Sequence, residues 1–427
     1  MIAARFRRSG LGWIMLAMLI LECANAYGAN STLGDSKSSG LAPRAMVLLT
    51  GGIGTIQAPT GQSPAVLNSA ELFDTVSRTF LPAGNLTAHR DRHAAVVLAS
   101  GKVLVIGGVN SILVPLILFP GPTMPWLISS TEIFDPATER FLPAATMQFA
   151  RDEPTATLLP NGKVLVIGGG VAHAELYDPA VEKFSNTVTA PSSRQGQTAT
   201  LLRDGKVLIA GGGDAEAELF DPVTEKFTPV GYMKTNRVYD TATLLLNGNV
   251  LIAGGAAYAR GPALLTTEIY DVASGAFIAG PAMTEPRAGH TATLLDDGRV
   301  LIAGGNENQL TEIYDPHINC FYPSAMMSES RRGHSATPLP SGNVLIAGGW
   351  DESYKPIATA ELYDPRTGQF SSPISMMQAR SGQTASLVWV NWPAARPSQS
   401  EISAVPAKPI SSSPTKKTVQ PVMPSAS

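Results

Sequence analysis

The stretch HTATLLDDGRVLIAGG, residues 290–305, decides the fold, because the chain carries seven versions of its second half. Each version is a short aliphatic run that ends in a glycine pair. The seven runs are MVLLTGG (46–52), KVLVIGG (102–108), KVLVIGG (163–169), KVLIAGG (206–212), NVLIAGG (249–255), RVLIAGG (299–305) and NVLIAGG (343–349). Successive glycine pairs are 56, 61, 43, 43, 50 and 44 residues apart. A period of about 40 to 50 residues is typical of a β-propeller, in which each unit forms a blade of four short strands.

Each run is followed by further strand and turn signals. A second run ends in aspartate: AELFD (70–74), TEIFD (131–135), AELYD (174–178), AELFD (217–221), TEIYD (267–271), TEIYD (311–315) and AELYD (360–364). A phenylalanine then closes each unit: Phe80, Phe141, Phe184, Phe227, Phe277, Phe321 and Phe370. Asn-Gly or Asp-Gly precedes four of the glycine-pair runs, as in Asp297-Gly298, and suits a two-residue hairpin. The pattern predicts an all-β, seven-bladed propeller.

The first and last units complement each other. Unit 46–82 has no strand before its glycine-pair run, whereas RSGQTASL (380–387) resembles such a first strand and has no unit after it. We therefore expect strand 383–389 to pair with strand 46–50, as the innermost strand of the N-terminal blade. Closure of this kind removes free sheet edges. The propeller is predicted to span residues 46–392.

The two ends of the chain differ in composition from the repeats. Residues 1–26 combine three arginines, the apolar run LGWIMLAMLIL (11–21) and Ala-Asn-Ala (24–26), which is typical of a secretory signal peptide. A twin-arginine signal and a lipidated Cys23 are weaker alternatives. We expect a flexible lead over 27–45 and a disordered, Pro- and Ser-rich tail over 393–427. The protein is thus predicted to be secreted or periplasmic.

The charge balance limits the possible partners. The 427 residues include 31 Lys and Arg against 34 Asp and Glu, with a formal net charge of −3. This balance gives no excess of basic residues that could bind nucleic acid, so nucleic acid is not expected as a partner. Two cysteines, of which cleavage would leave Cys320, cannot form a disulfide framework.

Taken together, these motifs resemble the kelch repeat. The shared features are an arginine, a small apolar run, a glycine pair at the end of the second strand, Tyr-Asp or Phe-Asp on the third and an aromatic residue on the fourth. The sequence of residues 290–305 is most similar to the galactose-oxidase-like branch of bacterial kelch propellers, and the resemblance covers about residues 46–390. The tryptophan of the family's fourth strand is phenylalanine in all seven units. We expect blade packing to survive, since phenylalanine also buries a large aromatic face.

Seven arginines occupy one repeat position, on the face that is predicted to carry the longer loops. They are Arg90, Arg151, Arg194, Arg237, Arg287, Arg331 and Arg380. The longer loops are 53–69, 109–130, 256–266 and 350–359. Near the same face, seven glutamates begin the third strands: Glu71, Glu132, Glu175, Glu218, Glu268, Glu312 and Glu361. The sevenfold repeat favours a structural role in which each arginine pairs with a glutamate. The alternative is that some arginines bind an anionic ligand, because the resemblance implies arginines here that recognise acidic peptides.

Three histidines share the slot three residues after the arginine. They are His93, His290 and His334, and the other units have Pro154, Gln197, Asp240 and Gln383 there. A slot that accepts proline and glutamine indicates the start of a strand, not a metal site. Galactose-oxidase-like enzymes need a cysteine-linked tyrosine, a Tyr-His pair and another histidine around copper. The chain has no Tyr-His pair, and Cys320 lies on the wrong face, so we expect no cofactor and no copper chemistry.

Loop 109–130 (VNSILVPLILFPGPTMPWLISS) is unusually apolar. It is expected either to fold over the propeller mouth as a plug or to expose a patch that meets a protein, a glycan or a membrane surface. Trp126 in this loop and Trp350 in loop 350–359 join the arginines as candidate ligand contacts.

The sequence therefore favours an exported, monomeric kelch propeller that binds a protein or carbohydrate ligand through its loop-bearing face. The alternative is an extracytoplasmic enzyme on the same fold. It would resemble a periplasmic sialic-acid mutarotase, which needs an asymmetric Arg/Glu cluster in the channel and is expected to have six blades, or a galactose-oxidase-like oxidase.

Overall fold

The computed structural model describes residues 43–58, 61–110, 126–190 and 192–391. The expected signal peptide, most of the expected lead, the centre of loop 109–130 and the expected tail lie outside these residues. No helix that is long and apolar enough to cross a membrane occurs in the described part of the chain.

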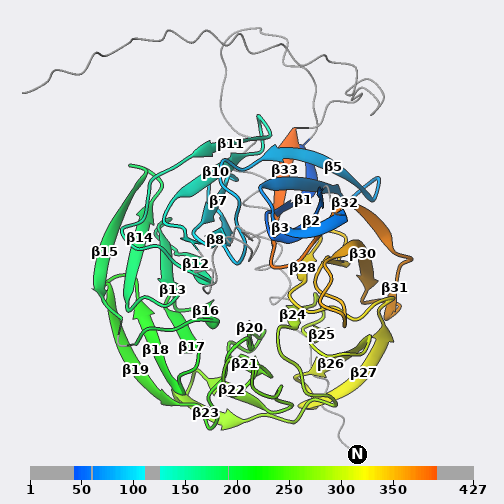
Figure 1. Cartoon of the computed structure of the whole chain (residues 1–427). Coiled ribbons are helices and arrows are strands. Elements are labelled where there is room, and N and C mark those ends of the chain that lie inside the picture. Colours follow the sequence, from blue (N-terminus) through cyan, green and yellow to red (C-terminus); the bar gives the residue numbers. More distant parts are fainter. Residues whose placement is uncertain (1–42, 59–60, 111–125, 191, 392–427) are drawn as a thin grey trace, which may run out of the picture. The chain divides into compact units, whose positions relative to one another are not determined.

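Seven antiparallel sheets are arranged in a ring (Figure 1). From the axis outward, blade 1 is β33(Thr384–Asn391), β1(Pro43–Thr50), β4(Ser69–Asp74) and β5(Thr79–Asn85); blade 2 is β6(Ala94–Val97), β7(Val103–Ile106), β10(Thr131–Asp135) and β11(Arg140–Pro143); blade 3 is β12(Pro154–Leu158), β13(Val164–Gly168), β14(His173–Asp178) and β15(Lys183–Thr189); blade 4 is β16(Gln197–Leu201), β17(Val207–Gly211), β18(Glu216–Asp221) and β19(Lys226–Tyr232).

Blade 5 is β20(Thr241–Leu244), β21(Val250–Ala253), β22(Thr267–Asp271) and β23(Ala276–Ala279); blade 6 is β24(Thr291–Leu294), β25(Val300–Ala303), β26(Leu310–Asp315) and β27(Cys320–Met326); blade 7 is β28(Ser335–Pro338), β29(Val344–Ala347), β30(Ile357–Asp364) and β31(Gln369–Phe370), with β32(Ile374–Arg380) also on β30. Two small hairpins lie outside the blades. They are β2(Ile53–Ala58) with β3(Gly61–Val66), and β8(Val109–Asn110) with β9(Trp126–Leu127).

The predicted fold and its closure are confirmed. Strand β33 pairs with β1 in the register Thr50↔Thr384 to Pro43↔Asn391, so both ends of the propeller build blade 1. The strand from the C-terminal end continues two residues beyond the predicted limit of 389. Innermost strands of adjacent blades contact one another around the ring, and β33 contacts both β6 and β28.

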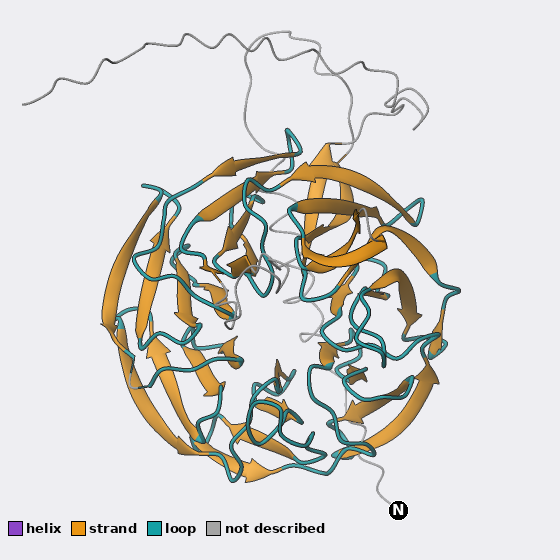
Figure 2. Cartoon of the chain, viewed as in Figure 1, coloured by secondary structure: helices purple, strands orange, loops and turns teal. Residues whose placement is uncertain are grey.

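The core consists of seven hydrophobic clusters, one between each pair of adjacent blades. Strand β21 shows why the glycine-pair runs are apolar on both faces. Val250 and Ile252 pack towards blade 4, whereas Leu251 and Ala253 pack towards blade 6. Every blade therefore buries both faces against its neighbours. Figure 2 shows the strands all around the ring.

The phenylalanines of the fourth strands take part in this packing. Each forms a tilted aromatic pair with the Phe or Tyr of the third strand, with ring centroids 4.9 to 5.1 Å apart. Tilted pairs at this distance are favourable. Phenylalanine thus fills the position that the resemblance assigns to tryptophan.

Candidate functional site

The seven repeated arginines are buried structural groups. Each is at most 3% exposed and forms an ion pair of 2.7 to 3.1 Å with the glutamate on the third strand of its own blade. Each also donates a hydrogen bond from Nη1 to the carbonyl oxygen of the first glycine in its blade's glycine pair. Burial lowers the pKa of Arg90, Arg151 and Arg380, and the paired glutamates oppose that shift. The expected Arg–Glu pairing is confirmed, while direct anion binding by these arginines stays a prediction.

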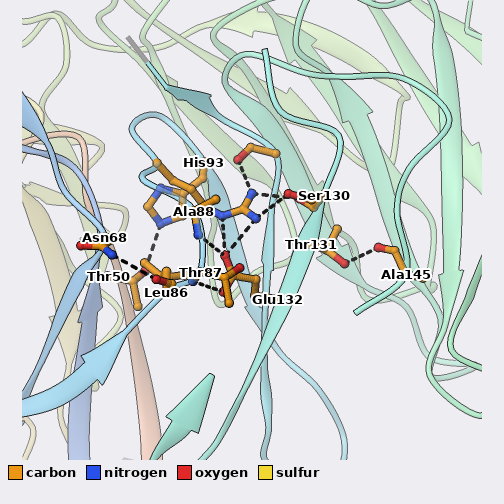
Figure 3. A network of polar contacts seen from close by, with 12 residues as sticks. Thr50, Asn68, Leu86, Thr87, Ala88, His93, Ser130, Thr131, Glu132 and Ala145 are labelled. Carbon is orange, nitrogen blue, oxygen red and sulfur yellow. Dashed lines mark hydrogen bonds and ion pairs between the residues drawn. The ribbon is translucent and has the colours of Figure 1, made fainter. Parts of the chain in front are cut away.

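The paired glutamates also fasten the segment that arrives from the preceding blade. Glu132 accepts hydrogen bonds from the backbone N–H groups of Thr87 and Ala88, just before Arg90 (Figure 3). Glutamates of five other blades accept the same kind of bond, from Gln148, Lys234, Thr284, Ser328 and Met377. One carboxylate therefore connects an arginine, a third strand and a crossing loop, which explains its recurrence.

The slot three residues after the arginine is a strand-start position, as predicted. His93, His290 and His334 each place Nε2 within 3.0 Å of a threonine hydroxyl on the preceding blade. Gln197 and Gln383 donate to a backbone carbonyl there instead. Burial lowers the pKa of all three histidines to about 3, so they are neutral at physiological pH.

The residues present do not fit a copper-radical centre. The described part of the chain holds no group of three or more His, Cys, Asp or Glu side chains that could hold a metal ion. The slot histidines point Nε2 at threonines, and Cys320 is exposed at the start of β27, after the turn between the third and fourth strands.

The residue two after each arginine forms a further ring, which the sequence analysis did not single out. We call it the channel-mouth ring, because it lies just before the innermost strands: Arg92, Glu153, Gly196, Tyr239, Gly289, Gly333 and Gly382. All seven have φ between 53° and 68°. Six links of the ring are hydrogen bonds of 3.0 to 3.3 Å, each from the N–H of one member to the carbonyl oxygen of the member in the preceding blade.

The ring opens at a cavity. Among the described residues, the seventh link, from Gly196 to Glu153, is not made. A cavity of about 260 Å³ lies there, lined by residues from the starts of blades 2 to 5: Arg92, His93, Glu153, Pro154, Thr155, Gly196, Gln197, Tyr239 and Asp240. The aromatic side chain of Tyr239 packs against Gly196. A Cβ atom added at Gly196 would lie 3.1 Å from Cε1 of Tyr239. All three non-glycine members of the ring therefore line one cavity.

The lining is charged and half-buried. Arg92 pairs with Asp152 at 3.2 Å, and more distantly with Asp91 at 3.6 Å and Glu153 at 3.7 Å. Burial raises the pKa of Asp91 and of Glu153 to about 7, against the opposing field of Arg92. Burial also raises the pKa of Asp240 to about 7. Carboxyl groups that titrate near neutrality and line a cavity are typical of functional sites.

The two candidate tryptophans lie elsewhere. Trp126 pairs with Asn110 in the small hairpin β8–β9 and is 77% exposed. Trp350 is half-buried, bridges to Arg332 and Pro356, and lines a separate hollow of about 30 Å³ together with Tyr354. Neither tryptophan lines the channel-mouth cavity.

A sequence signal for the channel-mouth ring did exist. Four units read Arg-x-Gly, whereas Arg92, Glu153 and Tyr239 replace the glycine in the other three. A large side chain where the repeat has glycine breaks the symmetry, and a departure from symmetry is what a site requires. The predicted positions were the arginine and the slot three residues after it, and the ring residue lies between them.

Comparison with known proteins identifies the fold. No protein-family model matches the sequence, and no curated protein matches it. A fungal alcohol oxidase of the AA5 family, solved in complex with copper, aligns with a TM-score of 0.58 and 16% identity over 84% of this chain and 76% of that chain. The structure of YjhT aligns with a TM-score of 0.50 and 13% identity over 66% of this chain and 97% of that chain. The chain is thus a seven-bladed β-propeller, and its expected similarity to galactose-oxidase-like proteins is confirmed at the level of the fold.

Proposed function

We propose that this protein is an exported binding module, whose channel-mouth cavity receives a small polar group of a protein or carbohydrate ligand. The observation that carries the proposal is the asymmetry of the channel-mouth ring. Four members are glycine, and the three that are not, Arg92, Glu153 and Tyr239, all line the same cavity. Glycine serves at this position in the other four blades, so the fold itself does not require these three side chains.

The cavity suits a small group. Its volume of about 260 Å³ is near the lower end of ligand pockets, which hold drug-sized molecules from about 300 Å³ upward. A single sugar ring or one protein side chain fits that size better than an extended peptide. The longer loops on the same face would supply the remaining contacts, since variable loops on a uniform scaffold commonly carry binding.

Export and monomeric state belong to the proposal as well. The signal-peptide pattern of residues 1–26 supports a secreted or periplasmic location. The closed ring supports a monomer, since blade 1 has its innermost strand from the same chain.

An isomerase-type enzyme is the second candidate, and one observation favours it. Asp91 and Glu153 have a pKa of about 7 and lie beside Arg92. Carboxyl groups with such pKa values can act as general acid and base near neutral pH. This is the asymmetric Arg/Glu cluster that a mutarotase-like reading requires, although the propeller has seven blades instead of the expected six.

A glycan and small-molecule binding screen on the whole chain tests the proposal. Ligands found with the parent should lose affinity in Glu153→Gln, while the matched control Glu307→Gln, on the same face but outside the cavity, should bind as the parent does. Binding that depends on Glu307 and not on Glu153 would contradict the proposed site and point to the hollow at Trp350. Conversion of a bound sugar between its anomers, lost in Glu153→Gln, would favour the isomerase.

A further inference from the structure

Acidic groups outnumber basic groups at the channel mouth. Three carboxyl groups, of Asp91, Asp152 and Glu153, lie within ion-pair distance of Arg92, and a fourth, of Asp240, lines the cavity as well. The neighbouring arginines of the repeat are already paired with their third-strand glutamates. The other cation near the cavity is Arg260, an exposed loop residue whose charge reaches Tyr239. An excess of negative charge therefore faces any ligand.

Asp240 forms no ion pair among the described residues; burial raises its pKa, although the charge of Arg237, which is paired with Glu268, lowers it. Its side chain lines the cavity and is 7% exposed, and neither carboxylate oxygen receives a hydrogen bond from another described residue. At the equivalent slot, Gln197 and Gln383 donate from Nε2 to a carbonyl of the preceding blade. An ionised aspartate cannot donate. Asp240 is one of four slot residues that line the cavity, with His93, Pro154 and Gln197, and it makes neither the histidine nor the glutamine contact there.

Two further acceptors at the cavity lack donors. Oε1 of Gln197 and Oε2 of Glu153 are buried, and neither has a hydrogen-bond partner among the described residues. Nδ1 of His93 is also unpaired, but so are Nδ1 of His290 and His334 and Oε1 of Gln383, which occupy the same slot away from the cavity. The unpaired oxygens of Asp240 and Glu153 are therefore the ones that are specific to the cavity. Buried polar atoms are normally satisfied, so a group of unsatisfied acceptors indicates a ligand that supplies donors.

The complementary chemistry is a group that donates several hydrogen bonds, carries positive charge and accepts none. A primary ammonium group has three N–H donors and no acceptor. It would meet Asp240, Gln197 and Glu153, and the aromatic ring of Tyr239, with which a cation can interact favourably, lines the same cavity. A hydroxyl group supplies only one donor, and a carboxylate would add a further acceptor to a site that already has too many.

We infer that the channel-mouth cavity recognises a primary ammonium group, held by Asp240 with Gln197 and Glu153. The inference rests on the proposed binding function and adds the chemical class of the group that enters the cavity. An amino sugar and a lysine side chain both carry this group, so the probes below separate the two sources.

Calorimetric titration of the whole chain tests the inference with matched probes at neutral pH. Glucosamine, glucose and glucuronate differ in one substituent, and n-butylammonium represents a lysine side chain without the sugar. We expect glucosamine to bind at least about tenfold more tightly than glucose, as one charge-assisted contact allows, and glucuronate to bind more weakly still. Binding of n-butylammonium as tight as that of glucosamine would assign the source to a lysine side chain; weaker binding would assign it to an amino sugar.

Variants separate this inference from the proposed function. Asp240→Asn should remove the preference for glucosamine over glucose, and Glu153→Gln should reduce it, while Glu307→Gln should keep it. If glucose binds in the cavity as well as glucosamine does, the ammonium inference fails and the binding function stands. If a probe binds but ignores both Asp240→Asn and Glu153→Gln, the cavity is not the site and both fail. Failure of both amine probes to bind at millimolar concentration overturns the inference.

Proton release provides an independent readout. The pKa values of Glu153 and Asp240, both about 7 in the free protein, should fall when a cation binds beside them. Binding near pH 7 should then release protons, and the measured heat should differ between phosphate and Tris buffers. Net proton uptake on binding glucosamine would contradict the inference.

Discussion

Three residues at the channel mouth have an unfavourable backbone conformation. Arg92, Glu153 and Tyr239 have φ of 53°, 57° and 58°, in the left-handed region that a side chain with a Cβ atom seldom occupies. Each costs about 1 kcal/mol or more relative to a relaxed backbone. Glycine occupies the same position in the other four blades, so the cost is not imposed by the fold. Non-glycine residues with positive φ also occur in the turns between third and fourth strands, as at Arg78 and Glu139. In the channel-mouth ring, however, all three of them line one cavity, which favours a functional role for these side chains.

The first prediction removes the left-handed strain from one blade and introduces it at the equivalent position of another. Glu153→Gly should stabilise the protein by about 0.5 to 1 kcal/mol, because it relieves the left-handed conformation and removes a carboxyl group from an acidic cluster. Gly289→Ala, at the equivalent position, should destabilise it by about 1 kcal/mol. Its new Cβ atom would meet nothing closer than 3.8 Å, so the loss would be strain and not a clash. Chemical denaturation measures both, and a destabilised Glu153→Gly protein would mean that this side chain supports the fold.

The second prediction concerns the pH dependence that Asp240 causes. Its pKa is about 7 in the folded protein and about 4 in the unfolded chain, so between these values the folded state binds more protons. Stability contributed by this group is therefore lost as the pH rises from about 4 to about 7. The three buried histidines act oppositely, because their lowered pKa makes stability fall as the pH decreases below about 6.5.

Asp240→Asn isolates the aspartate from these opposing effects. The variant should match the parent near pH 4 and exceed its stability by about 2 to 4 kcal/mol above pH 7, since each unit of pKa shift corresponds to about 1.4 kcal/mol. Thermal melts of both proteins across this range give the difference directly. A difference that is the same at every pH would show that Asp240 is not held in a raised-pKa state.

Among the structural elements, the glycine pairs are explained by what approaches them. The first glycine of each pair accepts the arginine's hydrogen bond, and in six blades its missing side chain makes room for the slot residue of the next blade; at Gly211 a Cβ atom would lie 2.5 Å from Asp240. The backbone N–H one or two residues after the first glycine donates a hydrogen bond to the carbonyl oxygen of the next blade's arginine, as Gly255 does to Arg287. The repeat motif is thus a device that connects adjacent blades.

The third prediction tests the buried ion pairs of this device. Arg237→Ala should destabilise the protein by about 3 kcal/mol or more, because it removes the partner of Glu268, which is 2% exposed. The matched control is Arg299→Ala, whose partner Asp297 is half exposed at 2.6 Å, and which should cost less than about 1 kcal/mol. An unchanged melting temperature in Arg237→Ala, together with lost ligand binding, would instead support a recognition role for the arginine.

The elements and their pairing could be predicted because each signal recurs seven times. A run buried on both faces, a glycine pair and an arginine in register occur in all seven units and a hairpin dipeptide in four, so strands, blade number and the Arg–Glu pairs followed from the residues. The site could not be read in the same way, because it consists of departures from the repeat. The acidity of Asp240, for example, depends on burial between two blades and not on its neighbours in sequence.

At the scale of the whole molecule, stability comes from adjacent blades only. Each hydrophobic cluster joins two neighbouring blades, and no cluster among the described residues spans the ring. Repeat proteins of this kind depend on every interface between neighbours. Opening the ring at one interface therefore exposes two blade faces at once, and blade 1 is the place where the chain itself could open, since it combines both ends of the propeller.

The fourth prediction locks this blade. Ala45 and Trp389 lie directly opposite each other on β1 and β33, and Trp389 is 57% exposed, so a cysteine pair there disturbs little packing. With Cys23 and Cys320 replaced by serine, the pair should form a disulfide within one folded chain and stabilise it by about 3 to 5 kcal/mol, because the bond closes a very long loop. The gain should disappear on reduction.

A chain that ends at residue 382 lacks β33, exposes the edge of β1 and should aggregate. Cross-links that form only between chains, or a soluble monomer from the shortened chain, would contradict closure by β33.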